Sequence, residues 1–158
     1  MRALLERPGP LLKFFFKLPV WLHKIGLGGW ERLFGAQWML ITTIGRKSGK
    51  FRETMVDVMD YDPDADTYYI EAAYGSRADW ARNIEVHPHF RAQVGRRKFQ
   101  ACLSALPGEH AGELMVKFYR AKPAYVRAVM AMAGMKFGGE QELCTLASRL
   151  TMYAVKPE

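Results

Sequence analysis

Alternation of apolar and polar residues dominates the middle of the chain and predicts a series of short β-strands. The pattern is clearest from Met55 to Asp60, where Asp57 lies between Val56 and Val58 and a second aspartate follows Met59. Turn-forming residues separate the runs, with Asp and Pro gathered at 62–66 and Gly-Arg-Arg at 95–97. We therefore expect a meander followed by a hairpin, with strands at residues 38–44, 52–61, 67–74, 90–94, 98–103 and 150–155.

A helical period replaces the alternation in four other stretches, at residues 10–25, 79–87, 108–120 and 123–133. Pro88 follows the second stretch and Pro123 opens the fourth, in keeping with the positions that proline tolerates at helix ends. Short strands combined with a few helices indicate an α+β domain built around a small barrel.

The first of these helical stretches is amphipathic. Leucine, phenylalanine and isoleucine side chains line one face, Lys13, Lys17 and Lys24 lie on another, and Pro19 should kink the helix. Such a helix can lie on a membrane surface or pack on the protein's own core. It is too short and too charged to span a bilayer, and no signal-peptide cleavage site follows it. We expect a cytoplasmic protein, with peripheral contact at the inner face of the membrane through residues 10–25 left open.

The charge of the chain indicates an anionic partner. The 158 residues include 23 Lys and Arg against 16 Asp and Glu, which gives a net charge of +7. Nucleic acid, a membrane surface or a phosphate-rich small molecule would each suit that excess. The cations at 91 and 96–98 have no interleaved aromatic residues for base stacking, so nucleic acid is not expected. Neither His87 and His89 nor the two cysteines have metal-ligand spacing, so no metal is expected either.

The segment from Gly45 to Arg52, with sequence GRKSGKFR, is the strongest candidate for an anion-binding turn. It links two expected strands, and its glycines can expose successive backbone amides to an anion. Ser48 adds a hydroxyl donor, while Arg46, Lys47 and Arg52 add charge and, for arginine, a fork that matches phosphate oxygens. The segment is not a P-loop, because the GxxxxGK[ST] order followed by a helix is absent.

Three ordered motifs resemble the family of deazaflavin (F420)-dependent nitroreductases and quinone reductases. They are TTIGRKSGKFR at 42–52, IEAAYG at 70–75 and WARNIEVHP at 80–88. The resemblance implies a split β-barrel, an antiparallel barrel like that of FMN-binding proteins, which holds coenzyme F420. It assigns residues 31–158 to this cofactor-binding domain and leaves residues 1–30 as an N-terminal amphipathic helical segment, with further helices beside the barrel.

The resemblance also implies which residues bind the cofactor. Its phosphate would lie on the turn, its ring beside the strands that follow, and a tryptophan and an asparagine would help to close the pocket. These residues are Arg46, Lys47, Ser48, Gly49, Arg52, Met55, Ala72, Ala73, Trp80 and Asn83. The chain departs from the family where proline is common, at Phe51 and Met55, and where a small hydroxyl residue and lysine are frequent, at Ala73 and Tyr74.

The implied chemistry is hydride transfer from the reduced deazaflavin to a hydrophobic acceptor such as a quinone, an enone or a nitroaromatic compound. A quinone or enone also needs a proton, for which Tyr74 is the leading donor and Tyr119 and Tyr125 are alternatives. A non-catalytic carrier of F420 or flavin, and an FMN-dependent enzyme on the same barrel, are the competing hypotheses. The sequence does not fix the oligomeric state.

Overall fold

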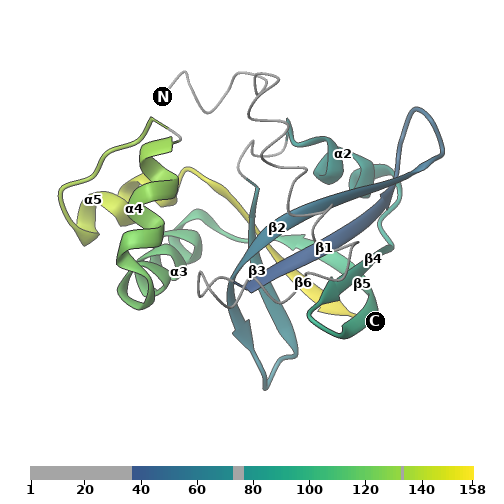
Figure 1. Cartoon of the computed structure of the whole chain (residues 1–158), viewed down its shortest axis with the longest axis horizontal. Coiled ribbons are helices and arrows are strands. Elements are labelled where there is room, and N and C mark those ends of the chain that lie inside the picture. The colour runs from purple at the N-terminus through teal and green to yellow at the C-terminus, as the bar shows by residue number, and fades with distance from the viewer. Residues whose placement is uncertain (1–36, 73–76, 133) are drawn as a thin grey trace.

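The computed structural model describes residues 37–72, 77–132 and 134–158. Its centre is a closed antiparallel barrel in which the strands follow the order β1-β2-β3-β6-β5-β4 (Figure 1). The strands are β1 (Gln37–Ile44), β2 (Phe51–Asp62), β3 (Thr67–Ala72), β4 (Phe90–Val94), β5 (Arg97–Ala105) and β6 (Thr151–Pro157). The helices are α2 (Asp79–Val86), α3 (Gly108–Ala121), α4 (Pro123–Met132) and α5 (Glu140–Ala147).

Tight turns fix the register of the barrel. β1 and β2 pair along their whole shared length, from Gln37 opposite Val58 to Ile44 opposite Phe51. The β2–β3 turn is held by Asp62, whose carboxylate accepts hydrogen bonds from two backbone amides of the turn. Gly95 takes a positive φ of 56° in the β4–β5 hairpin, a conformation that glycine adopts without steric cost.

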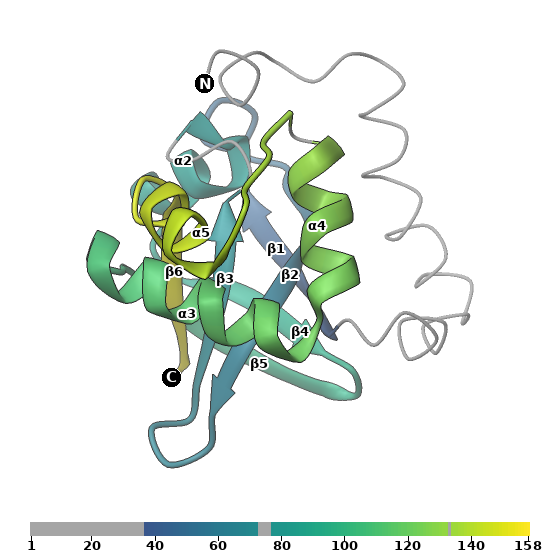
Figure 2. The same cartoon turned by 90° about the vertical axis from the view of Figure 1, so that its left-hand side faces the viewer.

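Two apolar cores result from the two faces of the barrel wall. One fills the barrel, where inward residues of every strand meet α2, and includes Met39, Ile41, Val56, Ile70 and Val155. The other lies between the outside of the wall and the helices α3, α4 and α5, which gather on one side of the barrel (Figures 1 and 2). Neighbouring residues along one strand therefore belong to different environments, as the alternating sequence requires.

The α+β class, the closed barrel and each predicted element within the described residues are confirmed, with ends shifted by a few residues. Helix α5 was not predicted, because only Leu143 and Ala147 on it are buried and its apolar period is short. The expected end of β3 at Ala73 and Tyr74 lies outside the described residues, as does the N-terminal segment 1–30. The division into segments 1–30 and 31–158 therefore stays a prediction. Within the described ranges, no helix is long and apolar enough to cross a membrane.

Candidate functional site

The turn between β1 and β2 closes on itself through its backbone. The amides of Ser48 and Gly49 donate to the Gly45 carbonyl at 3.1 and 2.8 Å, and the Gly45 amide donates to the Lys50 carbonyl at 2.8 Å. Gly49 has a positive φ of 65°. The sequence predicts a turn whose successive amides face an anion, whereas the amides of Gly45, Ser48 and Gly49 face carbonyl oxygens of the turn itself. These amides are used to form the turn, so an anion would meet mainly side chains.

Arg46 anchors the turn to helix α2. Its backbone amide and its Nη1 both donate to Oδ1 of Asn83, at 3.1 and 3.0 Å. Its Nη1 also donates to the Asp79 carbonyl oxygen at 3.3 Å, and Nη2 pairs with the Asp79 carboxylate at 2.9 Å. The structure thus places Arg46 and Asn83 in contact and directs Arg46 toward the protein. The guanidinium orients the turn.

The remaining polar side chains of the turn face outward. Lys47, Ser48, Lys50 and Arg52 are exposed, and the Ser48 hydroxyl accepts a hydrogen bond from Arg52 Nη2 at 3.5 Å. Phe51 is 64% exposed, with the Arg91 guanidinium 4.8 Å from the centre of its ring. Three cations and a hydroxyl on one exposed turn are the donor set that phosphate and carboxylate groups bind, so these residues fit the acidic part of F420.

The predicted ring contacts Met55 and Ala72 lie on opposite faces of the barrel wall. Met55 is opposite Leu40 in register and shares the outer face of β2 with Asp57. Ala72 is 2% exposed and belongs to the core inside the barrel, at the end of β3. Any contact of Ala72 with the ring would have to come from its backbone. Ala73, the third of these residues, lies outside the described chain.

Tyr125 on α4 reaches the same outer face of β2. Its hydroxyl donates a hydrogen bond of 2.7 Å to Oδ2 of Asp57. Burial raises the pKa of Asp57, and the hydrogen bond from Tyr125, the charge of Lys122 and the Trp38 indole oppose that rise. Burial, followed by the Asp57 charge, raises the pKa of Tyr125. A tyrosine hydroxyl and a carboxyl group therefore lie two residues along the strand from Met55.

A second carboxyl group, that of Glu71, belongs to this site. Burial, with a further contribution from the Asp57 charge, raises the pKa of Glu71 to about 7. The sequence analysis missed both acids. Each occupies the polar position of an alternating strand, which is where solvent-exposed acids also occur, and no local pattern separates the two cases.

The other predicted side chains are distributed between the two cores. Tyr119 lies on α3, where its hydroxyl accepts a hydrogen bond from Arg127 at 2.7 Å and its ring packs edge-on against Phe137. Trp80 is 8% exposed and contacts the Tyr153 ring edge-on in the barrel core. Tyr74 lies outside the described residues. Of the three candidate proton donors, Tyr125 is the one that the described structure brings to the face carrying Met55.

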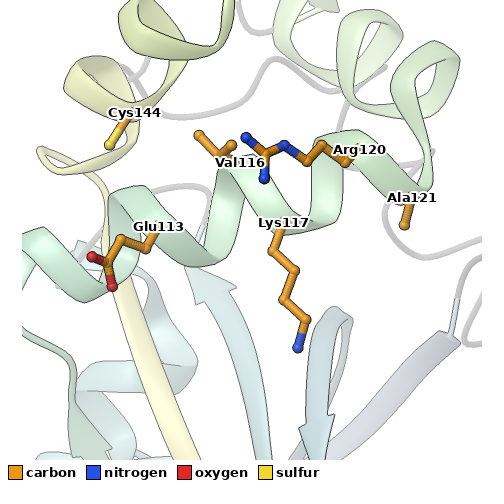
Figure 3. Close-up of a pocket in the computed structure, with 6 residues that line it drawn as sticks. All are labelled: Glu113, Val116, Lys117, Arg120, Ala121 and Cys144. Carbon is orange, nitrogen blue, oxygen red and sulfur yellow. The ribbon is translucent and has the colours of Figure 1, made fainter.

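A surface cavity of about 610 Å³ lies elsewhere, along α3 and beside α5 (Figure 3). Its lining residues are Glu113, Val116, Lys117, Arg120, Ala121 and Cys144. Lys117 pairs with Asp60 and Arg120 with Glu140, so both cations are already neutralised. None of the predicted cofactor residues lines this cavity, and we do not assign it to the cofactor. Among the described residues, no group of three or more His, Cys, Asp and Glu is placed to hold a metal ion.

Comparison with known proteins agrees with this description. Residues 23–133 match the family model of F420H2-dependent quinone reductases. A solved structure described as an F420H2-dependent reductase is 20% identical, covers 75% of this chain and 93% of its own, and gives a TM-score of 0.49. None of the curated proteins matches the chain in sequence.

Two further solved structures share the barrel fold at a TM-score of 0.50. One, from Clostridium acetobutylicum, is a protein related to general stress protein 26 in the pyridoxinephosphate oxidase family. It is 8% identical and covers 85% of this chain and 84% of its own. The other, a protein of unknown function from Agrobacterium tumefaciens, is 12% identical and covers 80% of this chain and 51% of its own. At such low identities these similarities concern the fold alone.

Proposed function

The chain belongs to the family of F420H2-dependent quinone reductases, and from this premise we propose that it transfers a hydride from reduced coenzyme F420 to a hydrophobic acceptor. A quinone is the first candidate for that acceptor, and an enone or a nitroaromatic compound would meet the same chemical requirement. Family membership makes the protein a deazaflavin-dependent oxidoreductase. This membership favours an F420-dependent enzyme over a non-catalytic carrier and over an FMN-dependent enzyme.

One observation carries the proposal: strand β2 connects the basic turn to the Tyr125 hydroxyl. Arg52 is the second residue of the strand, Met55 follows on it, and Asp57 accepts the hydrogen bond from Tyr125. With a rise of about 3.4 Å per residue, the five steps from Arg52 to Asp57 span roughly 17 Å. An elongated cofactor suits this arrangement, with its acidic tail at the basic turn and its redox ring near the Tyr125 hydroxyl.

The proposed roles follow from where each side chain lies. Lys47, Ser48 and Arg52 hold the phosphate, while Arg46 and Asn83 keep the turn in place. Gly49 gives the turn its shape, and Trp80 supports the pocket from the core. Met55 faces the ring from β2, and Ala72 and Ala73 border it at the end of β3. The remaining candidates for proton transfer are Tyr125, ahead of Tyr119 and Tyr74.

The cofactor, when bound, supplies the hydride, and the chain supplies position and a proton. Fixing the acidic tail on the turn limits where the ring can lie, which lowers the entropic cost of reaching the reactive geometry. The reduced acceptor then needs a proton on oxygen. Tyr125, which extends from α4 to the half-buried face of β2, can donate one.

The direct test is a titration followed by an assay with the full-length chain. Oxidised F420, FMN and NADP are titrated separately, and the oxidation of reduced F420 is then followed with menadione and with a nitroaromatic compound. We expect F420 to bind most tightly and menadione to be reduced. Binding of F420 without turnover of either acceptor would contradict the proposed reaction.

We also propose that residues 10–25 bring the enzyme to anionic membranes, where hydrophobic quinones are dissolved. The support is the amphipathic sequence, with Lys13, Lys17 and Lys24 on one side and leucine and phenylalanine residues on the other. Replacing the three lysines by glutamate in the full chain should reduce sedimentation with phosphatidylglycerol vesicles and leave F420 affinity unchanged. Equal sedimentation of variant and wild type would exclude this contact.

A further inference from the structure

The hydrogen bond between Tyr125 and Asp57 connects two elements that pack against each other, α4 and the wall of the barrel. Glu71 lies beside it. Val58 and Ile70 are opposite in the antiparallel register of β2 and β3, so the residues next to them, Asp57 and Glu71, are neighbours on the outer face. Three groups that can hold a proton thus form a row in space, from Tyr125 through Asp57 to Glu71.

Among the described residues, the groups around these acids do not neutralise both of them. Lys122, between α3 and α4, lowers the pKa of Asp57 through its charge, and the Trp38 indole on β1 lowers it as well. Two carboxylates this close in a half-buried site repel each other, which favours the state in which one of them keeps its proton. In agreement with the geometry, burial raises the pKa of both acids, that of Glu71 to about 7.

We propose that Asp57 and Glu71 share one proton at neutral pH and pass it through the Tyr125 hydroxyl to the acceptor. This inference rests on the proposed function and extends it to two residues that do not themselves touch the acceptor. The hydride reduces the acceptor by two electrons, and the acceptor oxygen then forms a bond to the Tyr125 proton. The Tyr125 oxygen takes the Asp57 proton in turn, and solvent protonates the acid pair again. Reduced F420 is the electron donor, and no further co-reactant is required.

The protonation state of Asp57 decides whether Tyr125 can act. When Asp57 is ionised, it accepts the Tyr125 proton in the 2.7 Å hydrogen bond, and that proton is held away from the acceptor. When Asp57 is protonated, its carboxyl group can donate to the Tyr125 oxygen over the same distance and leave the phenolic proton available. The acid pair therefore stores the proton that Tyr125 needs. When the pair loses this proton at high pH, proton transfer from Tyr125 to the acceptor stops.

The kinetic test uses the full-length enzyme with reduced F420 and menadione. We expect kcat of the wild type to fall as pH rises above about 7. Asp57→Asn should lower kcat roughly tenfold or more and leave KM for F420 near the wild-type value, and Asp57→Glu should restore part of the rate. Glu71→Gln removes the repulsion on Asp57, so the high-pH fall should move to lower pH by roughly one pH unit. Asp60→Asn, which removes a carboxylate of β2 that pairs with Lys117, is the matched control and should change neither quantity.

A second measurement does not depend on turnover. The carboxyl carbons of the cofactor-free protein are followed by ¹³C NMR during a pH titration. We expect one glutamate to titrate near pH 7 in the wild type, to disappear in Glu71→Gln and to titrate at lower pH in Asp57→Asn. Titration of Glu71 in the ordinary carboxyl range would overturn the shared proton.

The outcomes separate this inference from the function on which it rests. Turnover with unchanged pH profiles in Asp57→Asn and Glu71→Gln would overturn the proton relay and leave the reductase function standing. Absence of turnover in the wild type with any acceptor would overturn both.

Discussion

Asn83 joins helix α2 to the β1–β2 turn by accepting two hydrogen bonds from Arg46 through a single oxygen atom. Oδ1 receives the Arg46 backbone amide at 3.1 Å and Nη1 at 3.0 Å, while Nδ2 donates to the Thr43 hydroxyl at 3.1 Å. Because Asn83 is only 4% exposed, water cannot readily replace these bonds. The position of the basic turn therefore depends on a buried amide that is 37 residues away in sequence.

Truncating the Asn83 side chain to a methyl group should loosen the turn. Asn83→Ala leaves the Arg46 amide without its acceptor and the Thr43 hydroxyl without its donor, which should cost roughly 1–3 kcal/mol of unfolding free energy. F420 affinity should also fall, because Lys47 and Arg52 lose their fixed positions. Urea unfolding and fluorescence titration measure the two effects. Arg82→Ala, at an exposed position of the same helix, is the control. If Asn83→Ala kept the stability and the F420 affinity of the wild type, the hydrogen bonds of Asn83 would not be what holds the turn in place.

The exposed cations of the turn should set cofactor affinity through charge. Lys47→Ala removes one cation that faces solvent, and we expect F420 to bind roughly tenfold more weakly, equivalent to about 1.4 kcal/mol. The loss should shrink as salt is added, because screening weakens exposed charge pairs. Titrations at low and high salt test this. Lys98→Ala, a change of equal charge at an exposed position of β5, should bind F420 as the wild type does. An equal loss in both variants would mean that net charge, not the turn, attracts the cofactor.

The two glycines of the turn should respond differently to alanine. A Cβ at Gly45 would lie 2.7 Å from the Ser48 hydroxyl oxygen and 3.2 Å from the Lys50 carbonyl oxygen, so the hydroxyl would have to turn away from its present position and the carbonyl would have to shift. A Cβ at Gly49 meets no atom within 4 Å, and its cost is the positive φ alone, about 1–2 kcal/mol. Gly45→Ala should therefore weaken F420 binding more than Gly49→Ala does. Affinities measured side by side decide the point, and the opposite ranking would contradict this description of the turn.

The strands and the turn could be predicted because their signals are local. Alternation along Met55 to Asp60 and the glycines at 45 and 49 report backbone geometry directly. The direction of Arg46 could not be predicted in this way. It stands beside Lys47 in the sequence, yet a helix packed against the turn engages its guanidinium, and Lys47 stays exposed. Charge counting does not distinguish these two cations.

The acid pair was beyond sequence analysis for a related reason. The contact between Tyr125 and Asp57 spans 68 residues and exists only because α4 packs on the outside of β2. From the sequence, Tyr125 was one of three possible donors, and Asp57 and Glu71 were polar positions of ordinary strands. Tertiary packing turns these positions into a half-buried site and selects Tyr125 within the described structure.

The pH dependence of stability offers a test of Glu71 that needs no cofactor. Its pKa in the folded protein, about 7, lies above the ordinary value of 4.5, so between these limits the folded state binds the proton more strongly than the unfolded chain does. Stability from this group is thus fully present below about pH 4.5 and is lost as pH rises through about 7. The glutamine side chain in the Glu71→Gln variant cannot ionise, so the variant does not lose this stability as pH rises.

We therefore compare the unfolding free energies of Glu71→Gln and wild type at about pH 5 and about pH 8.5. The difference, variant minus wild type, should increase by up to about 3 kcal/mol from the lower to the higher pH. Urea unfolding at the two pH values measures the difference. Glu140→Gln is the control, because the Arg120 guanidinium lowers the pKa of Glu140 and gives its contribution the opposite sign. If the Glu71→Gln variant differed from wild type by the same free energy at both pH values, Glu71 would carry its charge in the folded protein without penalty. The half-buried outer face of β2 and β3 would then be solvated well enough to hold the ionised carboxylates of both Asp57 and Glu71.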